Sequence, residues 1–353
     1  HRSAALYRER TATICEDRKR SWSEVADRVA RLAGGLRLSG LRQGDHVALI
    51  GVNSDHYLEA YYAILWAGCV AVPFNTRWAD SEISYALEDS RPSAIFADAA
   101  LADRVDTLLQ DWTKLIRMDA NDGEGTAWRL ISDNAPIEDL SGSGNDLAAI
   151  FYTGGTTGKS KGVMLSHQGI VANWLGQQAV APYPDGTVFL HTPPLFHMAD
   201  ACCLFGLTQL GATHVFLPGF DPAAMVAAIA KHEITALFLV PTMIGMLCEY
   251  VAQNPADLSG IKQMFYGAST ISEAVLDKAM KAMPNADFRQ GYGQTELSPV
   301  ATMLLHQDHL DGKLTSAGRP IPQAGVRIID EGGKPLPPGE VGEVAVSGPG
   351  VML

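Results

Sequence analysis

The stretch FYTGGTTGKSKGVMLSH, residues 151–167, carries the strongest indication of how this chain folds. Between Gly154 and Ser160 it consists of glycines and threonines followed by Lys159, a composition typical of loops that bind phosphate through main-chain amides and hydroxyls. It nearly matches the nucleotide-binding P-loop, G-x-x-x-x-G-K-[ST], but Thr153 stands where that motif requires its first glycine. The stretch is therefore an altered P-loop, a chance cluster of small residues, or a phosphate loop of another kind.

The residues on either side of the loop distinguish these alternatives. LAAIFYT, residues 147–153, predicts a strand that enters the loop. A P-loop continues directly into a helix, whose first amides and dipole bind the phosphate. Here GVMLSH, residues 162–167, predicts a second strand, and a helical pattern begins only near Gln168. We therefore predict a hairpin that holds phosphates with its amides, the hydroxyls of Thr156 and Thr157 and its lysines. A P-loop NTPase or kinase is disfavoured.

Composition and charge limit the classes of function. The 353 residues are 47% hydrophobic, which is enough for a large core and two or more subdomains. Lys and Arg number 27 against 39 Asp and Glu, and the resulting formal net charge of −12 repels polyanions. No long run of basic residues forms a local exception to this charge, so we expect no nucleic-acid partner.

Cysteine usage and hydropathy favour a cytoplasmic protein without an integral membrane segment. The cysteines form no C-x-x-C motif and are interpreted as reduced, buried thiols: Cys15, Cys69, Cys202, Cys203 and Cys248. The amino-terminal residues are charged, unlike a secretory signal, and glycines and a proline interrupt the longest uncharged run, residues 201–220. The chain starts without Met and stops inside an apolar stretch, so we expect it to be part of a longer protein.

Strand-like and helix-like patterns alternate along most of the chain. Ser21 and Glu24 are a predicted capping box for a helix near residues 22–36, and Asp221 is the predicted cap of a helix up to residue 233. Further helices are expected at residues 55–68 and 242–250, and strands at residues 46–52, 69–74, 212–218, 234–240 and 261–267. This alternation predicts an α/β fold in which helices cover parallel sheets. From about Thr315 short strands between Gly/Pro turns predict a small antiparallel unit.

Several motifs carry a family resemblance. YTGGTTGKSKGVMLSH resembles the phosphate loop of the acyl-adenylate-forming enzymes, which include acyl-CoA synthetases, amino-acid adenylation domains and luciferases. PLFHMA around His197, YGAST from Tyr266, QGYGQTE at residues 290–296 and SAGRPIPQAGVRIID follow in the family's order. The resemblance covers nearly all 353 residues. It implies two mainly parallel, packed sheet subdomains over residues 1–314 and the start of a small antiparallel, β-barrel-like subdomain over residues 315–353.

The chain also departs from the family pattern. Gly154 stands where the family usually has serine, and Ser160 where proline is common. The double glycine favours fatty-acyl and related CoA ligases. The resemblance further implies that this chain is the large N-terminal portion, without the C-terminal lid domain that bears the catalytic lysine. We therefore expect it to bind ATP at best weakly and to form no thioester by itself.

The implied reaction is attack of a carboxylate on the α-phosphorus of ATP, which gives acyl-AMP and pyrophosphate, followed by displacement of AMP by a thiol, that of coenzyme A. ATP, Mg²⁺ and coenzyme A are thus the expected cofactor and co-substrates. Because two anions must meet, positioning and neutralisation of charge are expected to supply the rate. Glu296 is the expected magnesium ligand and Thr295 the donor to the α-phosphate, while Tyr292 and Gln290 are expected at adenine.

The resemblance thereby defines two sets of site residues. The expected nucleotide-binding set is Thr153, Gly154, Gly155, Thr156, Thr157, Gly158, Lys161, Gly267, Ala268, Ser269, Gln290, Gly291, Tyr292, Gly293 and Thr295. The expected catalytic set is Thr153, Lys161, His197, Thr295 and Glu296.

Several of these residues have an ordinary structural interpretation as well. Taken alone, Tyr292 indicates plain packing, Lys159 a solvated loop charge, and His197 a satisfied core histidine. The resemblance favours His197 as a wall of the carboxylate pocket, with the apolar run ACCLFGL beside it for an acyl or aryl tail. Asp200 is interpreted as structural, because the amino-acid activators usually place their aspartate in a different local pattern.

The identity of the acid stays open at this level. Fatty acids and aryl acids are both compatible with the sequence, and an amino-acid-loading domain of a peptide synthetase is the alternative. A non-catalytic binding module is a further alternative, which the intact loop and GYGQTE argue against. The sequence does not fix the oligomeric state, for which a homodimer is one option.

Overall fold

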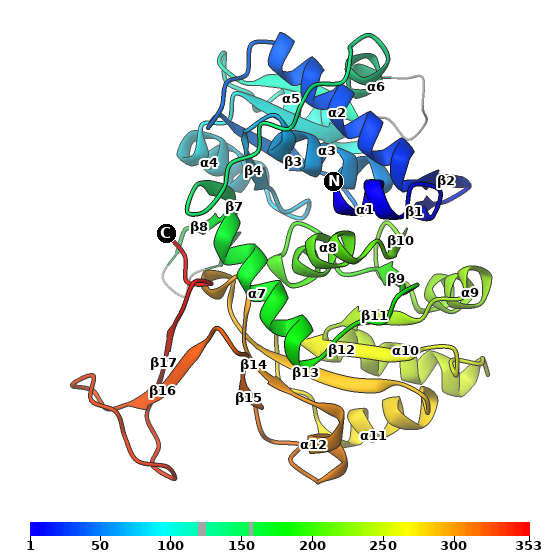
Figure 1. Ribbon diagram of the computed structural model, residues 1–353, viewed down its shortest axis with the longest axis vertical. Coiled ribbons are helices and arrows are strands. Elements are labelled where there is room, and N and C mark those ends of the chain that lie inside the picture. The colour runs from blue at the N-terminus through cyan, green and yellow to red at the C-terminus, as the bar shows by residue number, and fades with distance from the viewer. Residues whose placement is uncertain (119–124, 155–157) are drawn as a thin grey trace.

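The structure, a computed structural model, describes residues 1–118, 125–154 and 158–353. In these ranges two large, mainly parallel sheets lie one above the other, and a two-stranded hairpin projects from the body (Figure 1). Helix α7 (His167–Val180) runs from the upper sheet along the lower one, so it links the two halves.

The upper sheet has six strands within the described ranges, in the order β6-β5-β3-β4-β7-β8. Only β7 and β8 pair antiparallel. The strands are β3 (His46–Ile50), β4 (Val70–Pro73), β5 (Ala94–Asp98), β6 (Lys114–Met118), β7 (Leu147–Thr153) and β8 (Lys161–Ser166). The helices of this half are α2 (Trp22–Leu38), α3 (Asp55–Trp66), α4 (Asp80–Ser90), α5 (Ala99–Asp106) and α6 (Gly125–Ser132).

The lower sheet has nine strands among the residues described, in the order β15-β14-β13-β12-β11-β9-β10-β1-β2, and the pairs from β13 to β1 are parallel. Its strands are β1 (Thr11–Cys15), β2 (Arg18–Ser21), β9 (Val188–His191), β10 (Thr213–Phe216), β11 (Ala236–Leu239), β12 (Gln263–Gly267), β13 (Asp287–Gly293), β14 (Val300–Leu304) and β15 (Arg319–Pro320). Its helical segments are α1 (Arg2–Leu6), α7, α8 (Met198–Leu210), α9 (Pro222–His232), α10 (Pro241–Gln253), α11 (Glu273–Ala282), η1 (Thr295–Leu297) and α12 (His306–Leu310).

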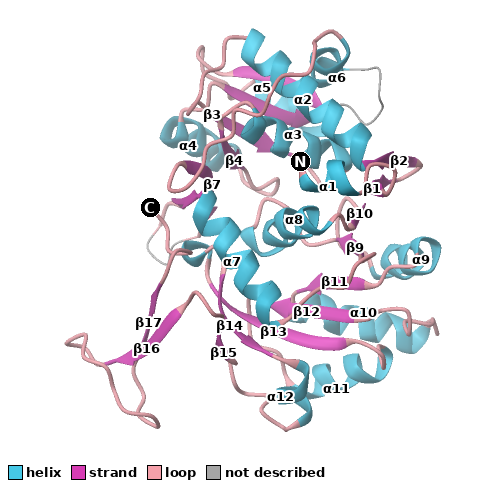
Figure 2. Cartoon of the chain, in the orientation of Figure 1, coloured by secondary structure: helices cyan, strands magenta, loops and turns pink. Residues whose placement is uncertain are grey.

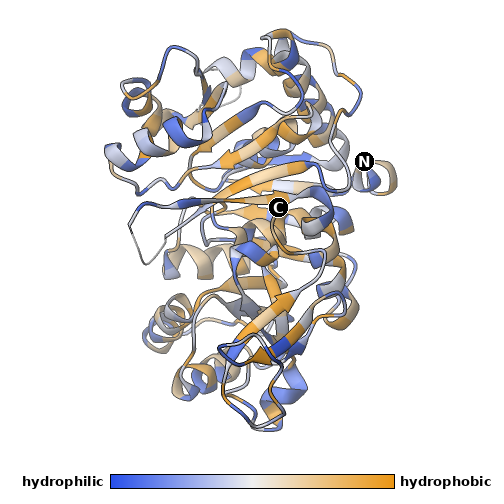
Figure 3. Cartoon of the chain, turned by 90° about the vertical axis from the view of Figure 1, so that its left-hand side faces the viewer, coloured by the Kyte–Doolittle hydropathy of each residue, from blue (hydrophilic) through white to orange (hydrophobic). Residues whose placement is uncertain are grey.

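Apolar cores separate these layers. One core lies between the sheets, where α2, α3, α7 and α8 pack with ring side chains of the lower sheet such as Phe189, Phe238 and Phe265. A second is formed by the opposite face of that sheet, including Leu237, with α9, α10 and α11. A third joins the upper sheet to α4 and α5. Helices therefore cover both faces of each large sheet (Figure 2), and the strands are predominantly apolar (Figure 3). The predicted fold class is confirmed.

Local sequence signals set several element boundaries. The Ser21 hydroxyl accepts from the Glu24 amide at 3.3 Å, and the Glu24 carboxylate accepts from the Ser21 amide at 2.7 Å, so the predicted capping box is present. The Asp221 carboxylate accepts from the Ala224 amide at 2.7 Å, as expected for the cap of α9. Pro241 occupies the first turn of α10, which is longer than predicted at both ends.

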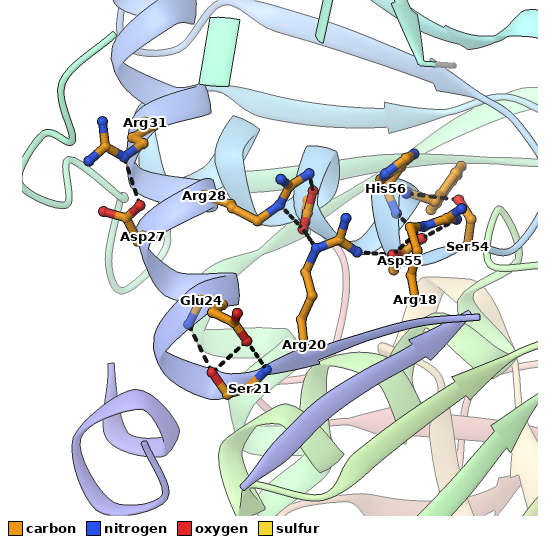
Figure 4. A network of polar contacts seen from close by, with 12 residues as sticks. Arg18, Arg20, Ser21, Glu24, Asp27, Arg28, Arg31, Ser54, Asp55 and His56 are labelled. Atoms are coloured by element: carbon orange, nitrogen blue, oxygen red, sulfur yellow. Dashed lines mark hydrogen bonds and ion pairs between the residues drawn. The ribbon is translucent and has the colours of Figure 1, made fainter. Parts of the chain in front are cut away.

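A buried ion network ties the two halves together (Figure 4). Arg18 and Arg20, on β2 of the lower sheet, both contact the Asp55 carboxylate at the start of α3 in the upper half; the Arg18 Nη2–Asp55 Oδ1 distance is 2.9 Å. One turn along α3, Glu59 receives two hydrogen bonds from Arg28 of α2 at 2.6 and 2.9 Å. The Asp55 and Glu59 side chains are each 1% exposed, so these charges interact in a poorly screened environment.

The carboxyl-terminal region differs from the prediction in two ways. β15 pairs with β14, so residues 319–320 extend the lower sheet instead of belonging to a separate unit. The strands that follow, β16 (Gly325–Ile329) and β17 (Glu343–Ser347), form an antiparallel hairpin and not a closed barrel within the described ranges. A further bridge joins Ile329 to Pro335, but two paired strands cannot close on themselves. The predicted antiparallel pairing is nevertheless present.

Two expectations from composition can also be compared with the structure. The five cysteines are all buried and free. Within the described ranges no helix has the length and apolar character needed to cross a membrane.

Candidate active site

The predicted phosphate loop joins two paired strands. β7 and β8 are antiparallel, and Thr153 faces Lys161 where the pairing ends. The helix that follows is α7, which begins only at His167 after its cap Ser166, so the loop opens into a strand and not into a helix. The predicted residues Gly155, Thr156 and Thr157 lie outside the described residues. This topology is that of the predicted hairpin and contradicts a P-loop.

The second predicted motif, QGYGQTE, runs along the end of β13 into the short helix η1. Gly291 is required because an added Cβ would lie 2.8 Å from the ring of Phe265 on the neighbouring strand. Gly293 is required because its added Cβ would lie 2.0 Å from the carbonyl oxygen of Pro299. The glycines thus let β13 approach its neighbours closely, which leaves the main chain free to line a cavity.

A pocket of about 360 Å³ lies where the two motifs meet. The predicted residues that line it are Thr153, Gly154, Gly267, Ala268, Gly291, Tyr292, Gly293, Thr295 and Glu296. The end of the phosphate hairpin and the expected magnesium ligand therefore share one cleft. They come together because the ends of β7, β12 and β13 all open toward it, as is usual for ligand sites in parallel sheets.

Other predicted residues lie outside this lining. Gly158 and Lys161 are exposed on the hairpin, and Ser269 is exposed beyond the pocket edge. Gln290 precedes the lining stretch on β13, and its side-chain Oε1 is buried without a hydrogen-bond partner. The Lys159 side chain extends toward α4 and not into the pocket, and its ammonium lies 4.6 Å from the centre of the Tyr85 ring.

His197 lies at the amino-terminal cap of α8, next to the pocket. Its side chain reaches solvent, whereas Ala199, the second residue of the helix, lines the cavity. The pKa of His197 is lowered, first because surrounding protein displaces part of its solvent and second because of the charge of Arg77. Buried Asn53 holds the preceding segment, donating to the Pro193 carbonyl at 2.8 Å and accepting from the Leu195 amide at 2.9 Å.

Asp200 has the structural position expected from the sequence. It is fully buried and absent from the pocket lining, and its Oδ2 lies 3.0 Å from Nδ1 of His191. The other ring nitrogen of His191 lies 2.9 Å from Nδ1 of His214. Burial raises the pKa of Asp200, and the neighbouring His191 only partly offsets this effect.

The apolar wall of the pocket was not predicted residue by residue. Phe238 of β11 and Phe265 of β12 line it with ring centroids 5.2 Å apart, together with Pro299 and Val300. Tyr266 faces the opposite side of the sheet, where its hydroxyl lies 2.8 Å from Nε2 of His309. Strand alternation from Gly267 would have placed Phe265 on the pocket side, since residues two apart share a face.

The metal chemistry of the site rests on a single carboxylate. Glu296 is half-buried in η1, and no group of three or more His, Cys, Asp or Glu side chains among the described residues is arranged to hold a metal ion. Mg²⁺ is typically bound through one or two carboxylates together with substrate phosphates and water. The arrangement fits a magnesium ion that arrives with a nucleotide.

Comparison with known proteins agrees with this geometry. The model of the AMP-binding enzyme family matches residues 1–353, and the chain belongs to that family. The feruloyl-CoA synthase of an Amycolatopsis species is 36% identical over 338 residues, covering 94% of this chain and 65% of that enzyme. The long-chain-fatty-acid–CoA ligase of Thermus thermophilus is 32% identical, covering 95% of this chain and 64% of that enzyme. The chain therefore spans about two thirds of the length of these relatives.

A solved structure is also similar. The o-succinylbenzoate coenzyme A synthetase of Bacillus subtilis, in complex with ATP and magnesium ion, superposes with a TM-score of 0.86 at 26% identity. The alignment covers 99% of this chain and 70% of that one.

Proposed function

We propose that the protein containing this chain activates a carboxylic acid with ATP and transfers the acyl group to coenzyme A. The observation that carries the proposal is the single pocket shared by the end of the phosphate hairpin and by Thr295 and Glu296. The family membership of the chain and the acyl-CoA ligases among its relatives support it.

In the first step a carboxylate oxygen attacks the α-phosphorus, the bond to pyrophosphate breaks, and acyl-AMP forms. In the second step the thiol of coenzyme A attacks the acyl carbon and AMP leaves. Magnesium, held by Glu296 and the phosphates, would supply positive charge against the accumulating negative charge.

The chain's own residues have separate tasks in this scheme. The amides near Thr153 and Gly154 bind the phosphates, and the hydroxyl of Thr295 donates to the α-phosphate. The exposed ring of Tyr292 lies at the pocket edge and offers a face to adenine. Phe238 and Phe265 exclude water from the acid and contact its apolar part. Positioning and charge therefore account for the rate without an enzyme nucleophile.

The pocket favours a fatty or aryl acid over an amino acid. A bound α-amino group needs a facing carboxylate, and Asp200 is buried against His191 instead of lining the cavity. Aromatic and aliphatic side chains form the wall beside the phosphate site. The buried free thiols support a cytoplasmic location as part of the same proposal. A homodimeric state is also proposed, and sedimentation would test it.

A panel of fatty, aryl and amino acids tested with the full-length protein distinguishes the proposed acyl-CoA ligase activity from its alternatives. We expect pyrophosphate release and AMP with at least one fatty or aryl acid, and acyl-CoA when coenzyme A is added. Production of ADP would indicate a kinase or ATPase, and pyrophosphate exchange stimulated only by amino acids would indicate a peptide-synthetase domain. Either result overturns the proposal.

A further inference from the structure

The turn that carries the expected nucleotide ligands is held by one buried side chain of α7. Asn173 is 2% exposed, and its Nδ2 donates to the carbonyl oxygens of Leu297 and Val300, both at 2.8 Å. Its Oδ1 accepts from the Val300 amide at 3.3 Å. These bonds bracket the chain just after Thr295 and Glu296.

The orientation of this carboxamide is determined by its partners. A main-chain carbonyl only accepts and an amide N–H only donates, so Nδ2 must face the two carbonyls and Oδ1 the Val300 amide. Gln177, one turn along α7, donates through Nε2 to Asn173 Oδ1 at 2.9 Å and holds the same orientation. Space around the amide is limited, since a Cβ on Gly350 would lie 3.3 Å from Nδ2.

The helix that carries Asn173 is continuous with the phosphate hairpin. β8 ends at Ser166, whose hydroxyl accepts from the Gly169 amide at 3.0 Å and caps α7. A second connection joins the same parts, because the Met352 amide donates to the Glu296 carbonyl at 2.8 Å and the Leu353 amide to Met164 of β8 at 2.9 Å. The hairpin and the turn are thus parts of one braced unit.

We propose that Asn173 is a positioning residue that sets the turn bearing Thr295 and Glu296 relative to the phosphate hairpin. The inference rests on the proposed function, in which one polyphosphate must touch the hairpin and the metal ligand at the same time. A displaced turn weakens that double contact, whereas the wall formed by Phe238 and Phe265 stays in place. Loss of Asn173 should therefore weaken the binding of MgATP and leave the binding of the acid unchanged.

The test is Asn173→Asp in the full-length protein, a change that keeps the size but removes both N–H donors. We expect the KM for MgATP and the Mg²⁺ concentration for half-activation to rise about tenfold, with the KM for the acid within about twofold, because lost donors leave two buried carbonyls unpaired. Gln177→Met should shift the same two quantities in the same direction by about threefold, and it decides the question if the aspartate variant does not fold.

Gln263→Leu is the matched control. Gln263 is also a buried amide, 5% exposed, and donates to the Pro182 carbonyl at 2.9 Å, but it lies at the opposite end of β12 from the pocket. The Gln263→Leu substitution should lower the unfolding midpoint without changing the KM for MgATP. A purely structural role for Asn173 would produce this same result, so unchanged KM and Mg²⁺ dependence in both α7 variants overturn the inference.

Direct binding separates this inference from the proposed function. Calorimetric titration with a non-hydrolysable ATP analogue and Mg²⁺ needs no acid substrate. If the wild-type protein binds the analogue and Asn173→Asp weakens binding, the positioning role stands even where no acid releases pyrophosphate. If binding is equal in both proteins, the positioning role fails while acyl-CoA formation can still hold.

Discussion

Replacing Asp55 by Asn should lower the free energy of unfolding more than the removal of an exposed ion pair does. The carboxylate is 1% exposed and contacts both Arg18 and Arg20 at the junction of the two halves. Burial alone would raise the pKa of Asp55, but the hydrogen bonds from Arg18 and the positive charges around it prevail, and the pKa falls from its ordinary 3.8 to about 2. At 1.36 kcal/mol per pKa unit this difference corresponds to ~2 kcal/mol.

The substitution also leaves buried guanidinium groups without their main counter-charge. Breaking a buried pair from one side costs about 3–5 kcal/mol in general, and Glu59, 3.5 Å from Arg20 Nε, offsets part of this cost. We therefore expect Asp55→Asn to lower the free energy of unfolding by ~3 kcal/mol in urea titrations near neutral pH. The matched control is Asp27→Asn, which removes a pair on the exposed side of α2 whose carboxylate is 51% exposed. That pair should contribute ~0.5 kcal/mol or less.

The pH dependence gives a second check on the same reasoning. Because the folded pKa of Asp55 lies below its unfolded value, its stabilisation is complete above about pH 4 and is lost as the pH falls toward about 2. The difference between wild type and Asp55→Asn should stay constant from about pH 8 to about pH 5 and narrow below about pH 4. A loss under ~1 kcal/mol near neutral pH, or an equal loss in Asp27→Asn, would refute the argument.

Three further changes test the active site. Glu296→Gln should slow acid-dependent pyrophosphate release at least about a hundredfold with the urea midpoint unchanged, and a near-normal rate removes Glu296 from the magnesium role. Gly291→Val places a Cβ 2.8 Å from the Phe265 ring and should reduce adenylation at least about tenfold while far-UV circular dichroism stays native; full activity would show that the ring moves freely. Asn53→Asp removes the hydrogen bond to the Pro193 carbonyl, in the segment before His197, and should raise the KM for the acid more than the KM for MgATP. A larger rise in the KM for MgATP would contradict this prediction.

Local sequence determined the elements of this fold. The short apolar, β-like run within residues 162–167 predicts a second strand, the one that leaves the phosphate loop, and β8 is that strand. The caps at Ser21 and Asp221 likewise depend on side chains that bond amides three residues away. Such signals act within one turn or one strand, so a single sequence contains them fully.

Tertiary structure alone decided which distant side chains meet. Asn173 has the pattern of an ordinary helix residue, and only the packing of α7 beside β14 places its amide against Leu297 and Val300. Strand alternation puts Phe265 and Tyr266 on opposite faces of β12, but which of the two faces the pocket depends on the side of the strand that meets it. The extension of the lower sheet by β15, expected as part of a separate unit, depends on its pairing with β14. Each contact is fixed by strand order and by the packing of helices between sheets, and these depend on the whole chain because no short segment buries its own apolar face.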